Sequence, residues 1–190
     1  MGKFLETLYD VLFHPYAAMR QIAANRLVGQ ALAAFLLSVL IPAFTVFFAF
    51  KAGNFVKFGI LLQTLGSLFV WFVGAAVFSL IAELFGGRGS AVGLFAALGF
   101  THVPWLVAVP LMVLAMLLPA NASAVALAII VLGIVCWMLL LDVAAIKGTH
   151  ELSTAKAVLV VLTPLLIMTA MVLVLMVFAG SALIPGRIWQ

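Results

Sequence analysis

Four polar side chains in a strongly apolar chain are the first candidates for chemistry. The carboxylates Glu83 and Asp142 and the imidazoles His102 and His150 lie within or beside long apolar runs. Zn²⁺ and other divalent metals accept this donor set, and the same groups can relay protons in a membrane. The four residues come from separate segments, and no local spacing such as His-x-x-x-His joins two of them. They are therefore weak metal-ligand candidates, and we assign no metal, no cofactor and no catalytic residue.

The two carboxylates leave two interpretations open. A carboxylate at the centre of a span costs ~2.5–3.5 kcal/mol, so both are expected near a span end, facing protein or water. In one interpretation Glu83, His102 and Asp142 line a common polar cavity on one side of the membrane. In the other they are shallow, separate groups, with the carboxylates paired to a nearby arginine or lysine. The candidate cations for that pairing are Arg88, Lys147 and Lys156.

A glycine-rich segment, 86–100, connects two apolar runs and has its own interpretations. It begins Gly-Gly-Arg-Gly-Ser and is too short and too rich in glycine for a complete span, so we expect a re-entrant or interfacial helix. Gly86 and Gly87 allow close backbone approach, and Arg88 beside them can contact a lipid headgroup. The alternative is helix packing, in which Gly89 and Gly93 let a short helix lie against a span.

Composition shows which elements must position these residues. Of 190 residues, 68% are hydrophobic and 7% are charged, against about 45–50% and roughly 25% in soluble domains. Runs without a charge cover 27–50, 58–82, 89–141 and 157–186. Since a span needs ~20 apolar residues, the longest run holds two spans. We expect an all-α membrane protein with five spans, at 27–50, 58–84, 102–118, 123–146 and 155–184.

The polar remainder is too small for a separate catalytic or nucleic-acid-binding domain. The nine basic residues give a net charge of +4 and are scattered at the span ends, so we expect them to meet lipid headgroups rather than nucleic acid. Residues 3–13 have a helical period, and the apolar face carries Phe4, Leu5, Leu8, Val11 and Leu12. We therefore expect an amphipathic helix in the membrane interface, Phe4, Leu8 and Leu12 buried among headgroups, and a division into 1–26 and a membrane domain at 27–190.

The distribution of basic residues predicts the orientation. With the N-terminus inside, five spans place six basic residues inside and three outside. The inside set is Lys3, Arg20, Arg26, Arg88, Lys147 and Lys156, and the outside set is Lys51, Lys57 and Arg187. The positive-inside rule therefore predicts a cytoplasmic N-terminus and an external C-terminus.

Several short motifs occur in a particular order along the chain. They are Leu12-Phe13-His14-Pro15, the segment 83–90 around Gly86-Gly87-Arg88, Gly99-Phe100-Thr101-His102-Val103-Pro104, a fourth span that carries tryptophan, and Ser153-Thr154-Ala155-Lys156-Ala157. In this order and with five spans, they make nearly the whole chain resemble the Yip family, named for proteins that interact with Rab and Ypt GTPases. The resemblance implies five spans and a cytosolic N-terminus. Family members of eukaryotes are trafficking factors with a long cytosolic N-terminal region, so a short region here implies a prokaryotic member in the cytoplasmic (inner) membrane.

The expected function is that of a non-enzymatic integral membrane protein, with an interaction or membrane-organising role at its cytoplasmic face. Its expected partners are membrane lipids, other membrane proteins or a second copy. A small transporter or lipid-moving protein that uses the inner polar residues is the alternative, and a metal-dependent membrane enzyme is a third, weaker class.

Overall fold

The computed structural model describes the backbone of residues 2–49 and 54–183, and all regular structure in these ranges is α-helical. The helices are α1 (Gly2–Phe13), α2 (Pro15–Asn25), α3 (Val28–Ala49), α4 (Asn54–Leu84), α5 (Ala91–Phe100), α6 (Pro104–Ala115), α7 (Ala120–His150) and α8 (Thr154–Leu183). The predicted span ends at residues 50 and 184, and the predicted external residues Lys51 and Arg187, lie outside the described residues.

Five stretches are long and apolar enough to cross a membrane, which confirms the predicted number of spans. They are Val28–Thr45, Phe58–Leu84, Ala91–Ala115, Ala120–His150 and Thr154–Phe178. Four of these lie on single helices, α3, α4, α7 and α8, in the places that the charge-free runs predicted.

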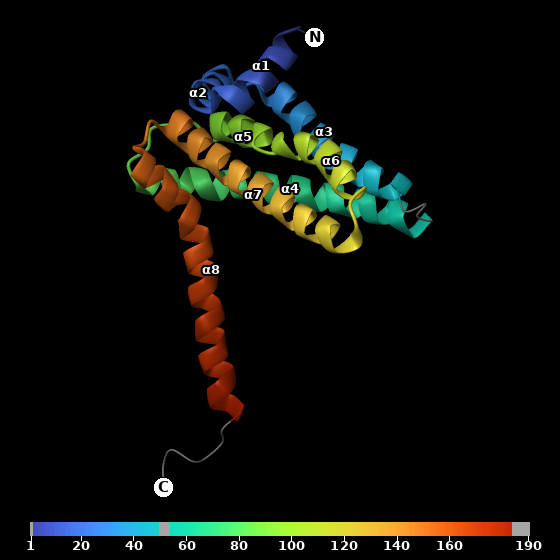
Figure 1. Cartoon of the computed structure of the whole chain (residues 1–190). Helices are drawn as coiled ribbons and strands as arrows, with labels where there is room; N and C mark the ends of the chain where they lie inside the picture. The colour runs from blue at the N-terminus through green and yellow to red at the C-terminus, as the bar shows by residue number, and fades with distance from the viewer. Residues whose placement is uncertain (1, 50–53, 184–190) are drawn as a thin grey trace.

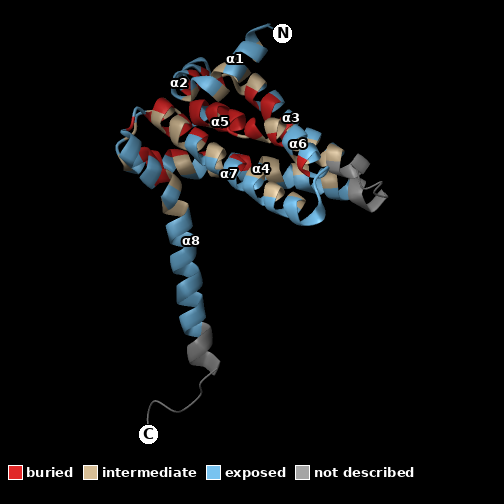
Figure 2. Ribbon diagram, in the orientation of Figure 1, coloured by how far each residue is buried: buried red, intermediate tan, exposed pale blue. Residues whose placement is uncertain are grey.

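The third stretch differs from the prediction, because it includes the glycine-rich segment. It consists of α5 and α6, joined by a turn at residues 101–103, whereas the predicted span began only at 102. Most of α5 is buried, including Leu94, Ala97 and Phe100, and Figure 2 shows it as the most buried helix of the bundle. The helix packs against α2, α3, α4 and α7. A re-entrant or interfacial position for 86–100 is therefore not confirmed.

A stack of three aromatic rings fixes α5 against α3 and α4. The Trp71 ring lies parallel to Phe35, with centroids 4.6 Å apart, and to Phe95, with centroids 4.0 Å apart. The indole Nε1–H donates to the Phe95 carbonyl at 3.1 Å. A Cβ on Gly99 would lie 2.7 Å from Trp71 Cζ2 and 2.9 Å from Ala31 Cβ, so only glycine lets these helices approach so closely.

The N-terminal helices pack onto this core. Pro15 occupies the first turn of α2, as the sequence predicted, and Met19 and Ile22 of α2 are fully buried. On α1, Val11 is buried, and Phe4, Leu8 and Leu12 pack against the core rather than standing free for lipid headgroups. The exposed apolar side chains of α1 are Leu5, Tyr9 and Phe13, spaced four residues apart on one face. The helix is amphipathic as predicted, but the predicted apolar face, apart from Leu5, packs against protein.

The helices run back and forth between two ends of the bundle (Figure 1). One end carries α1 and α2, the connection from α4 to α5, and the connection from α7 to α8, while the other carries the end of α3, the start of α4 and the connection from α6 to α7. The helix α8 packs on α4 and α7 near its start, where Ala157 and Val160 are buried, and then leaves the bundle. Residues 165–178 are all exposed, as Figure 2 shows.

Candidate functional site

Charged side chains gather at the first of these two ends, which we call the polar end. They come from α1, α2, the end of α4, the linker 85–90, the end of α7, the connection between α7 and α8, and the start of α8. The residues are Lys3, Glu6, Asp10, Arg20, Arg26, Glu83, Arg88, Lys147, Glu151 and Lys156. The remaining charged residue whose side chain the structure describes is Asp142, which lies within α7.

Glycines shape the linker at the polar end. Gly86 has φ +87° and ends α4, with its N–H donating to Glu83 O and the Gly87 N–H donating to Ala82 O, both at 2.9 Å. A Cβ on Gly87 would lie 2.8 Å from His150 Cβ, and one on Gly89 would collide with the Thr149 carbonyl oxygen. These glycines therefore let the linker lie against the end of α7, which supports the packing interpretation.

Glu83 and His150 are brought together by a serine. Ser79 Oγ lies 3.5 Å from Glu83 Oε1 and 3.4 Å from His150 Nε2. His150 is buried, and its Nδ1 has no hydrogen-bond partner within the described part of the chain. The ring is enclosed by the linker glycines, so this histidine is a packed group at the end of α7 with a polar contact to α4.

Asp142 and His102 have other surroundings. Asp142 is half-buried on α7, beside the Thr101 hydroxyl. His102 Nδ1 lies 3.3 Å from the Leu98 carbonyl oxygen. The His102 and Phe35 rings meet edge to face, with their centroids 4.8 Å apart. Among residues 2–49 and 54–183, no three His, Cys, Asp or Glu side chains gather as a metal site. The candidate set of Glu83, His102, Asp142 and His150 thus does not form one metal centre.

The expected pairing of the carboxylates with nearby cations is also wrong in detail. Lys156 Nζ donates to the Phe85 carbonyl at 2.8 Å, and Lys147 Nζ donates to Thr154 Oγ1 at 2.9 Å. The ion pair formed by described side chains joins Arg20 and Glu151, 3.6 Å apart and exposed to solvent. The lysines thus hold the linker and the start of α8 in place instead of neutralising Glu83 or Asp142.

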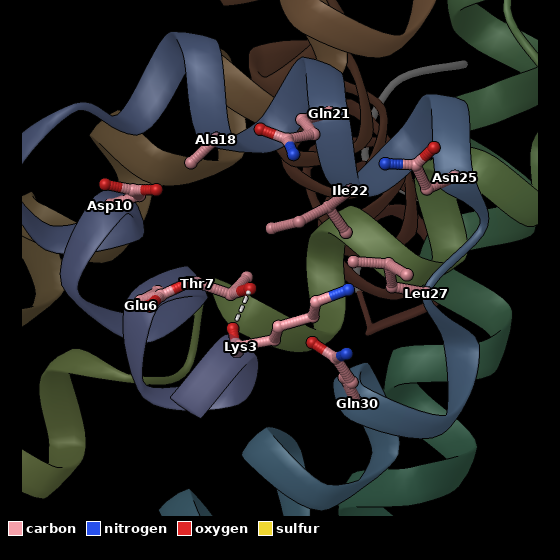
Figure 3. Close-up of a pocket in the computed structure, with 10 residues that line it drawn as sticks. All are labelled: Lys3, Glu6, Thr7, Asp10, Ala18, Gln21, Ile22, Asn25, Leu27 and Gln30. Atoms are coloured by element: carbon pink, nitrogen blue, oxygen red, sulfur yellow. Dashed lines mark hydrogen bonds between the residues drawn. The ribbon is translucent and has the colours of Figure 1, made fainter. Parts of the chain in front are cut away.

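Two pockets open at the polar end. The first, of about 350 Å³, lies between α1, α2 and the start of α3. Figure 3 shows Glu6 and Asp10 on one side and Lys3 reaching across toward Leu27 and Gln30. Its charged lining residues are two carboxylates and one lysine, accompanied by amides, so the first pocket is slightly acidic and does not favour an anion.

The second pocket, of about 370 Å³, is more basic, and we call it the arginine pocket. Its lining residues are Arg20, Ala23, Ala24, Arg26, Arg88, Gly89, Ser90, Gly148, Thr149 and Glu151. Three guanidinium-bearing residues and one carboxylate therefore share one cavity. Neither pocket is lined by Glu83, His102 or Asp142. Neither therefore supports a common cavity of these three residues, which the alternative function as a transporter requires.

Arg88 stands out in the sequence as a possible contact for a lipid headgroup, whereas Arg20 and Arg26 contributed only to the predicted orientation of the chain in the membrane. Arg20 and Arg26 precede Arg88 by more than 60 residues, and local spacing does not reveal that α2 lies over the linker. A sequence signal did exist at Arg26, which follows α2 where glycine or asparagine is common.

A family model matches most of the chain. No curated protein and no solved structure matches the chain. The model of the Yip1 domain matches residues 9–176, which include the end of α1, all of α2 to α7 and most of α8. The match spans most of the chain, as the motif order predicted. The chain belongs to the Yip1 domain family.

Proposed function

We propose that this membrane protein of the Yip1 domain family is a non-enzymatic interaction or membrane-organising factor that acts through its polar end. The observation that carries the proposal is the collection of charged side chains at one end: of the charged side chains that the structure describes, all but that of Asp142 come from segments at this end. Recognition of a partner or of lipid headgroups needs polar groups outside the hydrocarbon region, and this end supplies them.

The proposal places the polar end in the cytoplasm, and the protein in a prokaryotic cytoplasmic membrane. Support comes from the six-to-three division of basic residues, which the positive-inside rule converts into an inside N-terminus. Four of the described inside residues, Arg20, Arg26, Arg88 and Lys156, belong to the segments that meet at this end. Membrane lipids, other membrane proteins and a second copy are the partners we propose.

Photo-crosslinking from the two ends tests the proposal. A photoreactive residue is placed at the exposed polar-end positions Gln21 or Ala155, and matched controls carry it at the exposed positions Leu117 or Ala122 of the opposite end. We expect discrete crosslinked products, resolved by mass spectrometry, from the polar-end positions alone. The same products from both ends, or no product from either, would contradict a role of the polar end in interaction.

A further inference from the structure

We propose that the arginine pocket binds the phosphate group of an anionic phospholipid. The inference deepens the proposed function, because it names a ligand for the polar end. The shared chemistry is a phosphate oxyanion, which guanidinium groups recognise by paired, charge-assisted hydrogen bonds.

Three chain segments bring the cations together. Arg20 lies on α2, Arg26 is the residue at which α2 ends, and Arg88 lies in the linker before α5. The side chains of Arg26 and Arg88 have no hydrogen bond or ion pair to another described side chain, while Arg20 has only its solvent-exposed contact with Glu151. The donors are therefore available to an anion that enters the pocket.

The neutral part of the lining adds hydrogen-bonding groups. Ser90 and Thr149 line the pocket, and the buried Thr149 hydroxyl has no hydrogen-bond partner in the described ranges. Gly148 lets α7 lie close to α2, since a Cβ at this position would lie 3.1 Å from the Arg20 backbone N. A cavity of about 370 Å³ with these groups has room for a phosphate and the adjoining glycerol of a lipid headgroup.

Backbone conformation supplies an independent observation. Arg26 and Glu151 are the two non-glycine residues with positive φ in the described ranges, at +48° and +54°. Each ends a helix at a position that glycine or asparagine fills more easily, and both line the arginine pocket. Charged residues in a strained conformation at one cavity indicate that their side chains, rather than the turns, are what the site requires.

A carboxylate in the arginine pocket competes with a phosphate for Arg20. Glu151 Oε1 lies 3.6 Å from Arg20 Nη2 and would be repelled by a bound phosphate. An entering phosphate therefore has to displace this carboxylate from Arg20, which leaves the apparent affinity below that of three unopposed arginines. The position of the pocket at the polar end favours a lipid source, because basic pockets between spans on the cytoplasmic side suit anionic headgroups.

Two glycine substitutions separate binding from folding. Arg26→Gly and Glu151→Gly relieve the same kind of backbone strain, so both variants are expected to fold at least as well as the natural chain. They remove opposite charges from one pocket. Native mass spectrometry of the full chain with phosphatidylglycerol should show binding weakened about fivefold in Arg26→Gly and strengthened by up to about fivefold in Glu151→Gly. Arg88→Gln should weaken binding to a similar extent.

Two further ligands identify the source of the phosphate. Phosphatidylcholine has the same phosphate without net negative charge, so its binding should be weak and insensitive to the substitutions. Inorganic phosphate is expected not to displace phosphatidylglycerol at equal concentration, and binding of inorganic phosphate alone with the same dependence on Arg26 would overturn the lipid assignment. Equal phosphatidylglycerol binding by all variants would overturn the pocket. Crosslinks confined to the polar end would in that case still uphold the proposed function.

Discussion

Gly89→Ala tests how closely the linker must approach α7. The added Cβ would collide with the Thr149 carbonyl oxygen and lie 2.8 Å from the Thr149 carbonyl carbon and 2.9 Å from His150 Cγ. Two of these atoms belong to backbone, so the linker has to move away from α7 as a unit. Overpacking of this kind costs about 1–3 kcal/mol. The movement also weakens the bond from Arg88 N–H to His150 O, now 3.2 Å, which contributes about 0.5–1.5 kcal/mol.

One effect acts in the opposite direction, because alanine reduces the entropy of the unfolded chain and returns about 0.4–1 kcal/mol. The expected net loss is about 1–3 kcal/mol in the free energy of unfolding, measured by titration with a denaturing detergent in mixed micelles. The matched control is Gly133→Ala on α7, where a Cβ meets nothing within 4 Å and stability should stay equal or rise. A Gly89→Ala protein as stable as this control would refute the claim that contact between linker and α7 requires glycine.

Three other predictions concern the core, the first helix and the topology. Trp71→Phe keeps the aromatic stack but loses the bond to the Phe95 carbonyl, so stability should fall by about 1 kcal/mol, and an unchanged unfolding curve would contradict this. In bilayers, spin labels at Leu5, Tyr9 or Phe13 should be shielded from water-soluble relaxation agents while a label at Glu6 is not; equal exposure would exclude membrane contact of that face. Reporter fusions after residues 88 and 149 should report the cytoplasm and one after 121 the exterior, and the reversed pattern would overturn the orientation.

The apolar helices could be predicted because the membrane requirement acts on each segment separately. A charge-free run of sufficient length can be recognised without knowledge of its neighbours, as for α3, α4, α7 and α8. The segment containing Gly93 and Gly99 left two interpretations open, because composition does not distinguish glycine that loosens a helix from glycine that admits a close neighbour. Gly99 is of the second kind, with Trp71 and Ala31 beside it.

The first helix shows a different limit. Lipid and protein interior are both apolar, so the periodicity of α1 reveals an apolar face without revealing what covers it. Phe4 and Leu8 pack on the core, and Leu5 and Tyr9 remain exposed. The arginine pocket depends on contacts between distant segments, and for that reason no local pattern revealed it. The proposed metal ligands shared an end of the bundle, but position along a helix does not determine which way each side chain turns.

The departure of α8 from the bundle affects how the protein responds to its membrane. The first turns of α8 are anchored by Ala157 and Val160, while residues 165–178 are exposed on all sides. A helix held at one end can tilt to match the hydrocarbon thickness at a cost of only fractions of a kcal/mol per Å of mismatch. Changes in bilayer thickness therefore act on the angle of α8 without repacking the aromatic stack of Phe35, Trp71 and Phe95. The protein thus has a packed bundle of helices and one further helix, α8, whose tilt follows the thickness of the surrounding bilayer.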